Sequence, residues 1–219
     1  MKMSYLERAE DVLESLGLDL DGARARAPLP DLGTSALVLL DLQRLFVDPA
    51  SPAFLPSWPA IEDRVRTLVR AYSRAGRPVV WTRHVHPPTD RGGTIGRLFG
   101  RLIHDGDPLS DLAAGWDPGP GDIVIAKPRH SAFARTDLAN LLADRGVTTV
   151  VLAGVQAHLC VLATAVEAGS SDLMPVVALD AIVAPDLDLH RASLRALSGG
   201  LAWIASTREI VHALEEVRW

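Results

Sequence analysis

Cysteine and lysine are both scarce in this sequence of 219 residues. Cys160 is the single cysteine, so a disulfide within the chain is excluded and a reducing compartment is expected. Only Lys2 and Lys127 are lysines, and the other 20 of the 22 basic residues are arginines. Because a desolvated lysine can lose its proton and an arginine cannot, the one internal lysine is a candidate for a specific role.

Excess basic charge and long apolar runs are also missing. The net charge is −5 and the pI is about 5.8, which argues against nucleic acid as a partner because no basic excess is available to neutralise phosphates. No run approaches the roughly 20 apolar residues of a membrane span, and residues 1–16 lack the apolar centre of a signal peptide. We therefore expect a cytoplasmic protein that binds a small-molecule substrate, without a metal or other cofactor.

Six apolar runs of strand length alternate with stretches of helical periodicity. The runs lack the polar alternation of a half-exposed strand, so they suit strands that are covered on both faces of a parallel sheet. We expect strands at residues 35–41, 78–82, 122–126, 148–154, 175–180 and 201–205. This pattern predicts an α/β fold with a doubly wound, mostly parallel six-stranded sheet flanked by helices in three layers.

The chain is expected to divide into two regions. Residues 1–30 begin with a Ser-x-x-Glu capping box and apolar residues at helical spacing, which predicts an amphipathic helix followed by a connector. Residues 31–219 are expected to form a single domain. Within it, short helices are predicted at 95–103 and 136–145, and another from about residue 160 to 168.

Three chemically distinctive residues fall where predicted strands end. Asp41 closes the first strand, Lys127 follows the third, and Cys160 lies just beyond the fourth at the start of a predicted helix. Ligands of doubly wound sheets bind at this carboxyl edge. A helix N-terminus and an ammonium would both lower the pKa of the thiol from about 8.5, a carboxylate could move its proton, and backbone N–H groups could hold an oxyanion.

Each of these residues also has a commoner explanation. A lone cysteine is more often a small buried apolar residue than a nucleophile, an aspartate at a strand end often caps a turn, and Lys127 could be an ordinary cation at a strand end. Taken singly, the commoner explanation is preferred for each. Their predicted convergence at one edge favours the catalytic interpretation.

Four segments in the same order resemble isochorismatase-like hydrolases. ALVLLDLQRLF (36–46) is similar to the family's first strand, IAKPRHSAFARTDLANLL (125–142) to its lysine segment and VVLAGVQAHLCVLATAVEA (150–168) to its nucleophile segment, while MPVVALDAIVA (174–184) resembles the next strand. The resemblance covers roughly residues 35–205. It implies a catalytic triad of Asp41, Lys127 and Cys160, a cis peptide bond between Val155 and Gln156, and an oxyanion hole formed by the backbone amides of Gln156 and Cys160.

Two departures from the family pattern leave the substrate open. Metal-binding amidases of the family carry Asp-x-His after the second strand, whereas this chain has His84 and His86 there. Residues two apart on a strand share a face, so a metal pair is conceivable, but we expect pocket or surface histidines and no metal. GVQAHLC resembles the isochorismatase subgroup, in which glycine usually replaces the nucleophile, yet Cys160 is present here.

Three functions are therefore compared. The preferred one is a cysteine hydrolase that cleaves an amide, carbamoyl or lactam C–N bond through an acyl-enzyme. The alternatives are an isochorismate-type vinyl-ether hydrolase that releases pyruvate with Asp41 as general acid, and a non-catalytic binding module. Phe46, His84, Arg91 and Gln156 are candidates for substrate binding, and the resemblance implies a homodimer or homotetramer.

Overall fold

The computed structural model describes residues 28–217 and contains one six-stranded parallel sheet. The strands run in the spatial order β3-β2-β1-β4-β5-β6, and every neighbouring pair is parallel. They are β1 (Ser35–Leu40), β2 (Val79–His84), β3 (Ile123–Lys127), β4 (Thr149–Val155), β5 (Met174–Val183) and β6 (Trp203–Ala205). This confirms the predicted doubly wound sheet. The predicted N-terminal helix falls in residues 1–27, outside the described part.

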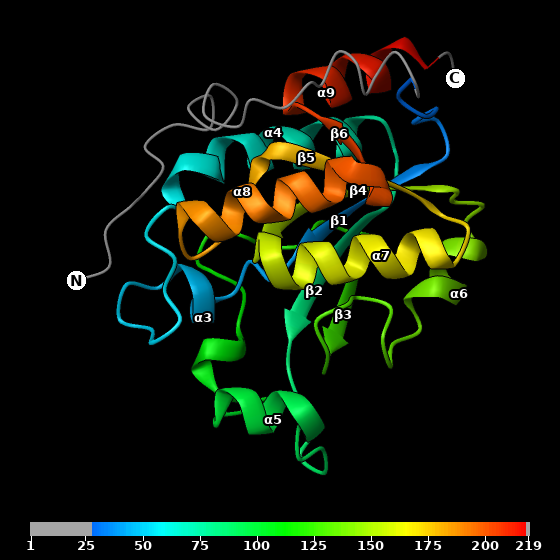
Figure 1. The fold of residues 1–219 in the computed structure, drawn as a ribbon. Helices are drawn as coiled ribbons and strands as arrows, with labels where there is room; N and C mark the ends of the chain where they lie inside the picture. Colours follow the sequence, from blue (N-terminus) through cyan, green and yellow to red (C-terminus); the bar gives the residue numbers. More distant parts are fainter. Residues whose placement is uncertain (1–27, 218–219) are drawn as a thin grey trace.

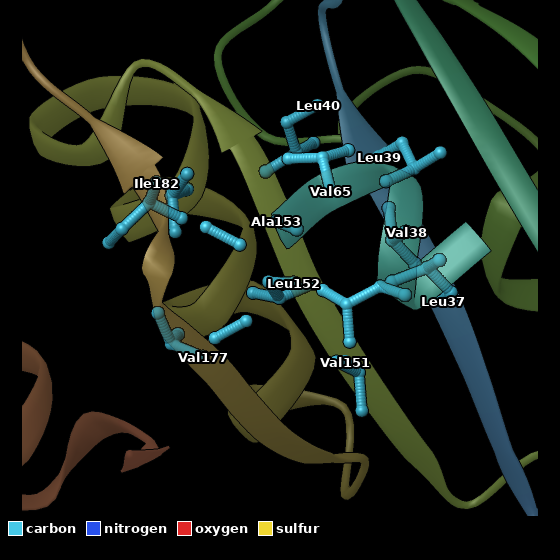
Figure 2. Close-up of a cluster of buried hydrophobic side chains, with 14 of the residues drawn as sticks. Leu37, Val38, Leu39, Leu40, Val65, Val151, Leu152, Ala153, Val177 and Ile182 are labelled. Carbon is cyan, nitrogen blue, oxygen red and sulfur yellow. The ribbon is translucent and has the colours of Figure 1, made fainter. Parts of the chain in front are cut away.

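The centre of the sheet is buried on both faces, as its unbroken apolar runs require. All residues of β1 and β4 are buried, and the two strands pair in register from Ser35 with Thr149 to Leu40 with Gly154. Figure 2 shows the side chains of these strands packed with Val65, Val177 and Ile182. The apolar core therefore lies directly beneath the ends of the strands on which the distinctive residues sit.

Helices cover both faces of the sheet (Figure 1). The pair α4 (Pro59–Arg74) and α9 (Thr207–Glu216) packs against β5 on one face. The other face carries α6 (Leu138–Ala143), α7 (Leu162–Ser170) and α8 (Leu187–Ala196). This division follows from right-handed crossovers, because the chain moves outward from β1 in one direction and from β4 in the other. Within residues 28–217, no helix is long and apolar enough to span a membrane.

Several short elements differ from the predicted ones. A helix α3 (Arg44–Val47) and a 3₁₀ turn η1 (Pro108–Ser110) were not expected, and the Arg44 amide donates to the Asp111 carbonyl between them. The predicted helix at 95–103 is α5 (Gly93–Phe99), which ends at Gly100, where φ is +70°. A wide turn η3 (Leu197–Leu201) takes the place of the first residue of the last predicted strand.

The chain order in the sheet reverses between β1 and β4. β1 connects to β2 on one side, whereas β4 on its other side connects outward to β5. The crevice outside the carboxyl ends of two such strands is the usual ligand site in open parallel sheets. Asp41 follows β1 at this point, and the wide turn η2 (Ala157–Val161), which contains Cys160, follows β4.

Candidate active site

Asp41 occupies the turn that leaves β1. Its backbone φ is +54°, a left-handed conformation that aspartate tolerates better than most residues. The Thr82 hydroxyl donates to Asp41 Oδ1 at 2.6 Å, and Lys127 Nζ lies 2.7 Å from Oδ2. Thr82 Oγ1 also accepts from the Asp41 amide at 3.2 Å. Thr82 of β2 therefore holds one oxygen of the carboxylate, and the Lys127 ammonium holds the other.

Lys127, the last residue of β3, has a fully buried side chain. Its Nζ lies 2.7 Å from Asp41 Oδ2 and donates to Cys160 Sγ at 3.3 Å and to the Arg129 carbonyl at 3.2 Å. An ammonium has three protons, and each of these contacts can use one. Burial disfavours the charged form, but Asp41 and Cys160 outweigh that effect and raise the pKa of Lys127 above its ordinary value. Lys127 therefore carries a positive charge near neutral pH, at the centre of the site.

Cys160 is the fourth residue of η2, and its side chain is buried. The sulfur accepts a hydrogen bond from Lys127, and the Asp41 carboxylate is close enough to raise the pKa of the thiol. Burial raises the pKa of Cys160 to about 12, and the nearby Lys127 charge lowers it only in part. The expectation that a helix start would lower this pKa was therefore wrong, because desolvation dominates in the folded protein. The resting thiol therefore keeps its proton, and the carboxylate of Asp41 lies on the other side of the shared Lys127 contact.

The peptide bond between Val155 and Gln156 is cis, at the position that the resemblance implied. Gln156 then begins the turn, and its carbonyl accepts hydrogen bonds from the Leu159 and Val161 amides. This turn brings the sulfur of Cys160 back toward the ends of β1 and β3. The proposed role of the Gln156 and Cys160 amides as an oxyanion hole stays a prediction.

The four candidate substrate-binding residues occupy different environments. His84 ends β2 and is the register partner of Lys127 in β3. Gln156 is half-buried at the turn that carries the thiol, whereas Phe46 is 7% exposed and packs in the apolar core. Arg91 is exposed in the segment before α5. Of the four, the structure places His84 and Gln156 beside the Asp41–Lys127–Cys160 cluster.

Two supporting residues were missed by the sequence reasoning. Gln43, fully buried, accepts from the His84 amide at 2.6 Å and donates to the Ser110 carbonyl at 2.8 Å, so it ties the end of β2 to η1. Thr82 positions Asp41. Both had a signal in the sequence, because Gln43 belongs to the first resembling motif and Thr82 is a polar residue that closes an apolar strand.

Four histidines cluster beside Lys127. The ring of His84 lies 5.0 Å from that of His86 and 6.3 Å from that of His130, and His104 lies 6.3 Å from His86. Burial lowers the pKa of His84 to about 3, and burial also lowers the pKa values of His86 and His130. Across residues 28–217, no three His, Cys, Asp or Glu side chains are arranged to hold a metal ion.

A separate hollow lies at the amino-terminal edge of the sheet. It has a volume of about 860 Å³ and is lined by Leu29, Met174, Leu201 and Trp203, among others. Leu29 precedes β1, and the other three precede or begin β5 or β6. The Asp41–Lys127–Cys160 cluster instead lies at the carboxyl ends of β1, β3 and β4. Its size does not make it the reaction site, because it contains none of the three reactive groups.

Comparisons with known proteins agree with this architecture. A family model described as an isochorismatase domain matches residues 35–209. Nicotinamidase 3 of Arabidopsis thaliana is 32% identical over 189 residues, which cover 84% of this chain and 91% of that protein. An isochorismatase of Bacillus subtilis is 27% identical over 189 residues, which cover 85% of this chain and 60% of that protein. The crystal structure of N-carbamoylsarcosine amidase from Thermoplasma acidophilum superposes with a TM-score of 0.70 at 28% identity, covering 80% of this chain and 96% of that one.

Proposed function

Because the chain belongs to the isochorismatase family of hydrolases, we propose that it cleaves the C–N bond of a small amide through a thioester on Cys160. The observation that carries this proposal is the contact of Lys127 Nζ with both Asp41 Oδ2, at 2.7 Å, and Cys160 Sγ, at 3.3 Å. A proton acceptor, a cation and a nucleophile thus share one buried contact network.

The first step forms the thioester. Asp41 accepts the thiol proton while Sγ attacks the carbonyl carbon of the amide, and Lys127 compensates the negative charge that develops on the sulfur. The protonated Asp41 then returns that proton to the amide nitrogen, the C–N bond breaks, and the amine or ammonia leaves. Proton transfer must accompany attack, because burial keeps the pKa of Cys160 near 12.

The second step releases the acid. Asp41 accepts a proton from a water molecule, whose oxygen attacks the thioester carbonyl carbon, and the proton then returns to the leaving sulfur. The free thiol and the carboxylic acid are the products, and the carboxylate and ammonium of the protein are regenerated. Lys127 stays charged throughout, since Asp41 and Cys160 together raise its pKa.

Amide bonds are the substrate class that the relatives support. Nicotinamidase 3 is named for the hydrolysis of an aromatic carboxamide. N-carbamoylsarcosine amidase is named for the cleavage of a C–N bond of a carbamoyl group. We infer that this chain acts on the same bond type, namely an amide, carbamoyl or lactam C–N bond.

Intact-protein mass spectrometry tests the thioester directly. The full chain is mixed with a panel of small amides and quenched in acid, and a mass increase that maps to Cys160 is expected together with release of the amine. Cys160→Ala should show neither, while Cys160→Ser, which keeps the size of the side chain, should retain the fold by circular dichroism. Full turnover by Cys160→Ala would end the proposal.

A second candidate is hydrolysis of a vinyl ether with release of pyruvate. It is favoured by the similarity to the Bacillus subtilis isochorismatase and by the raised pKa of Cys160, which leaves the thiol uncharged at rest. In this reaction Asp41 would protonate the substrate and the sulfur would be a bystander. Pyruvate formation from isochorismate that survives Cys160→Gly and disappears in Asp41→Ala would establish this function instead.

A further inference from the structure

The hollow at the amino-terminal edge of the sheet, which we call the β5–β6 hollow, has a mostly apolar wall. Leu173, Met174, Leu201 and Trp203 contribute large apolar side chains to it. Leu201 is 39% exposed, and the other three are only partly buried. Its volume of about 860 Å³ falls within the range of about 300–1,000 Å³ that encloses whole ligands. An apolar surface of this size suits a binding partner that covers it.

Trp203 gives a second sign that this wall is incomplete. Its indole Nε1 is buried and has no hydrogen-bond partner among residues 28–217. A buried indole N–H normally donates to an acceptor, so a further group is needed beside it. Trp203 also begins β6, the three-residue strand at one edge of the sheet. Proteins often cover such an edge with another part of the chain, because its backbone groups are only half paired.

The path of the chain brings one candidate partner to this hollow. Pro28 and Leu29, the first residues that the structure describes, are themselves part of the wall, and Leu29 packs against the core. Residues 1–27 are therefore joined to the rim of the hollow, which gives them a high effective concentration there. The 11 residues 17–27 can span up to about 36–40 Å when extended. Residues 4–16 can therefore reach any part of the wall.

The sequence of residues 4–16 has the pattern of a segment that binds an apolar surface. Four apolar residues recur at helical spacing and define the apolar stripe: Leu6, Ala9, Leu13 and Leu16. Four acidic residues fall on the opposite side of the predicted helix: Glu7, Glu10, Asp11 and Glu14. A helix of 13 residues is only marginally stable alone in water, so the apolar stripe needs a surface to pack on.

The charges of the hollow and of the connector are complementary. Asp172 and Glu209 lie on the wall, and no basic residue lines it among the described positions. The connector that enters the hollow carries Arg24 and Arg26 directly before Pro28. With the apolar stripe against the wall, the acidic side of the predicted helix faces water and the two arginines approach the acidic rim. Opposite charges placed in this way fix the orientation of a docked segment.

We propose that residues 4–16 bind the β5–β6 hollow of the same chain, with the apolar stripe against Leu173, Leu201 and Trp203. This inference does not depend on the proposed hydrolysis, because the hollow lies at the opposite edge of the sheet from Asp41, Lys127 and Cys160. The segment acts as a strap over the starts of β5 and β6. It stabilises the edge of the sheet and takes no part in substrate binding.

Disulfide trapping in the full chain tests the contact. Leu201→Cys is combined in turn with Leu6→Cys, Leu13→Cys and Leu16→Cys, and with Glu14→Cys as the control on the acidic side. Cys160 does not compete, because its thiol is buried. Under mild oxidation, at least one stripe variant should form an intramolecular disulfide about tenfold faster than the control, as measured by intact mass and non-reducing electrophoresis. Equal rates for stripe and control would overturn the inference, as would covalent dimers in place of cross-linked monomers.

Thermal unfolding tests the same contact without a cross-link. Leu13→Asp is expected to lower the melting temperature by about 2–4 °C, whereas Glu14→Gln should leave it unchanged. In Leu201→Asp, the further replacement Leu13→Asp should cost much less, because the two side chains share one contact. An unchanged melting temperature in Leu13→Asp would overturn the inference. So would the same loss whether or not Leu201 is replaced.

Discussion

Lys127 Nζ and Asp41 Oδ2 lie 2.7 Å apart, and both side chains are fully buried. Asp41 follows β1 and Lys127 ends β3, two strands that are not neighbours because β2 lies between them. Thr82 of β2 bridges the gap by donating to the other oxygen of Asp41. A buried ion pair of this kind adds little to stability by itself, but the loss of one partner leaves an uncompensated charge in the core.

Replacement of Lys127 by methionine should therefore destabilise the protein strongly. We expect the free energy of unfolding in urea to fall by about 3–5 kcal/mol, because Asp41 would remain buried without its cation. The double variant Asp41→Asn/Lys127→Met removes both charges and should be more stable than Lys127→Met alone. Equal stability of the single and double variants would show that the pair is not coupled.

Stability should decrease in acid as the buried histidines are forced to accept protons. The pKa of His84 is lowered from 6.5 to about 3, and that of His190 to about 4, in both cases by burial. The unfolded chain therefore binds these protons first, so the free energy of unfolding falls as the pH drops from about 6.5 toward 3. His84→Phe should flatten this dependence in urea titrations, whereas the exposed variant His212→Gln should follow the unaltered protein.

Alkylation of the thiol should be slow at neutral pH. The thiolate is the reactive form, and burial raises the pKa of Cys160 from 9.0 to about 12. The rate of iodoacetamide labelling, followed by mass spectrometry, should therefore keep rising between about pH 10.5 and 12, where labelling of a free cysteine has levelled off. Lys127→Met should slow labelling further, because Lys127 lowers the pKa. A plateau near pH 7 would contradict this account.

Gly154 should not tolerate any side chain. Its φ is +107°, and a Cβ atom there would lie 2.3 Å from the Leu40 carbonyl oxygen in the neighbouring strand. Gly154→Ala is expected to lower the free energy of unfolding by more than about 3 kcal/mol. Gly169→Ala provides the control, since Gly169 lies in α7 with nothing within 4 Å of its added Cβ, and it should gain about 0.5–1 kcal/mol.

The sheet could be predicted because its central strands are apolar on both faces. Six continuous runs fixed the number of strands, and the alternation with helices fixed their parallel direction. The same logic placed Asp41, Lys127 and Cys160 at one edge, since parallel strands present their carboxyl ends together. Short elements such as α3 and η1 were missed because they depend on contacts between distant segments, such as the Arg44 amide with the Asp111 carbonyl.

The electrostatics of the site were less accessible from sequence. The start of a helix after β4 predicted a lowered thiol pKa, but the depth of Cys160 in the structure raises it instead. The four histidines beside Lys127 show the same limitation. His84 and His86 are two residues apart in the sequence, whereas His104 and His130 come from separate segments that only the folded chain brings near. Burial and long-range proximity carry no local sequence signal.

Helix α5 stands apart from the three layers, beyond the carboxyl ends of β2 and β3 (Figure 1). It is flanked by Gly92 and Gly100 in left-handed conformations, and only Ile95 within it is buried. Because this helix shares almost none of the core, substitutions of its exposed residues are expected to change the melting temperature little. Sequence changes in α5 can therefore alter the surface beside His130, which Phe99 faces, without changing the strands that carry Asp41, Lys127 and Cys160.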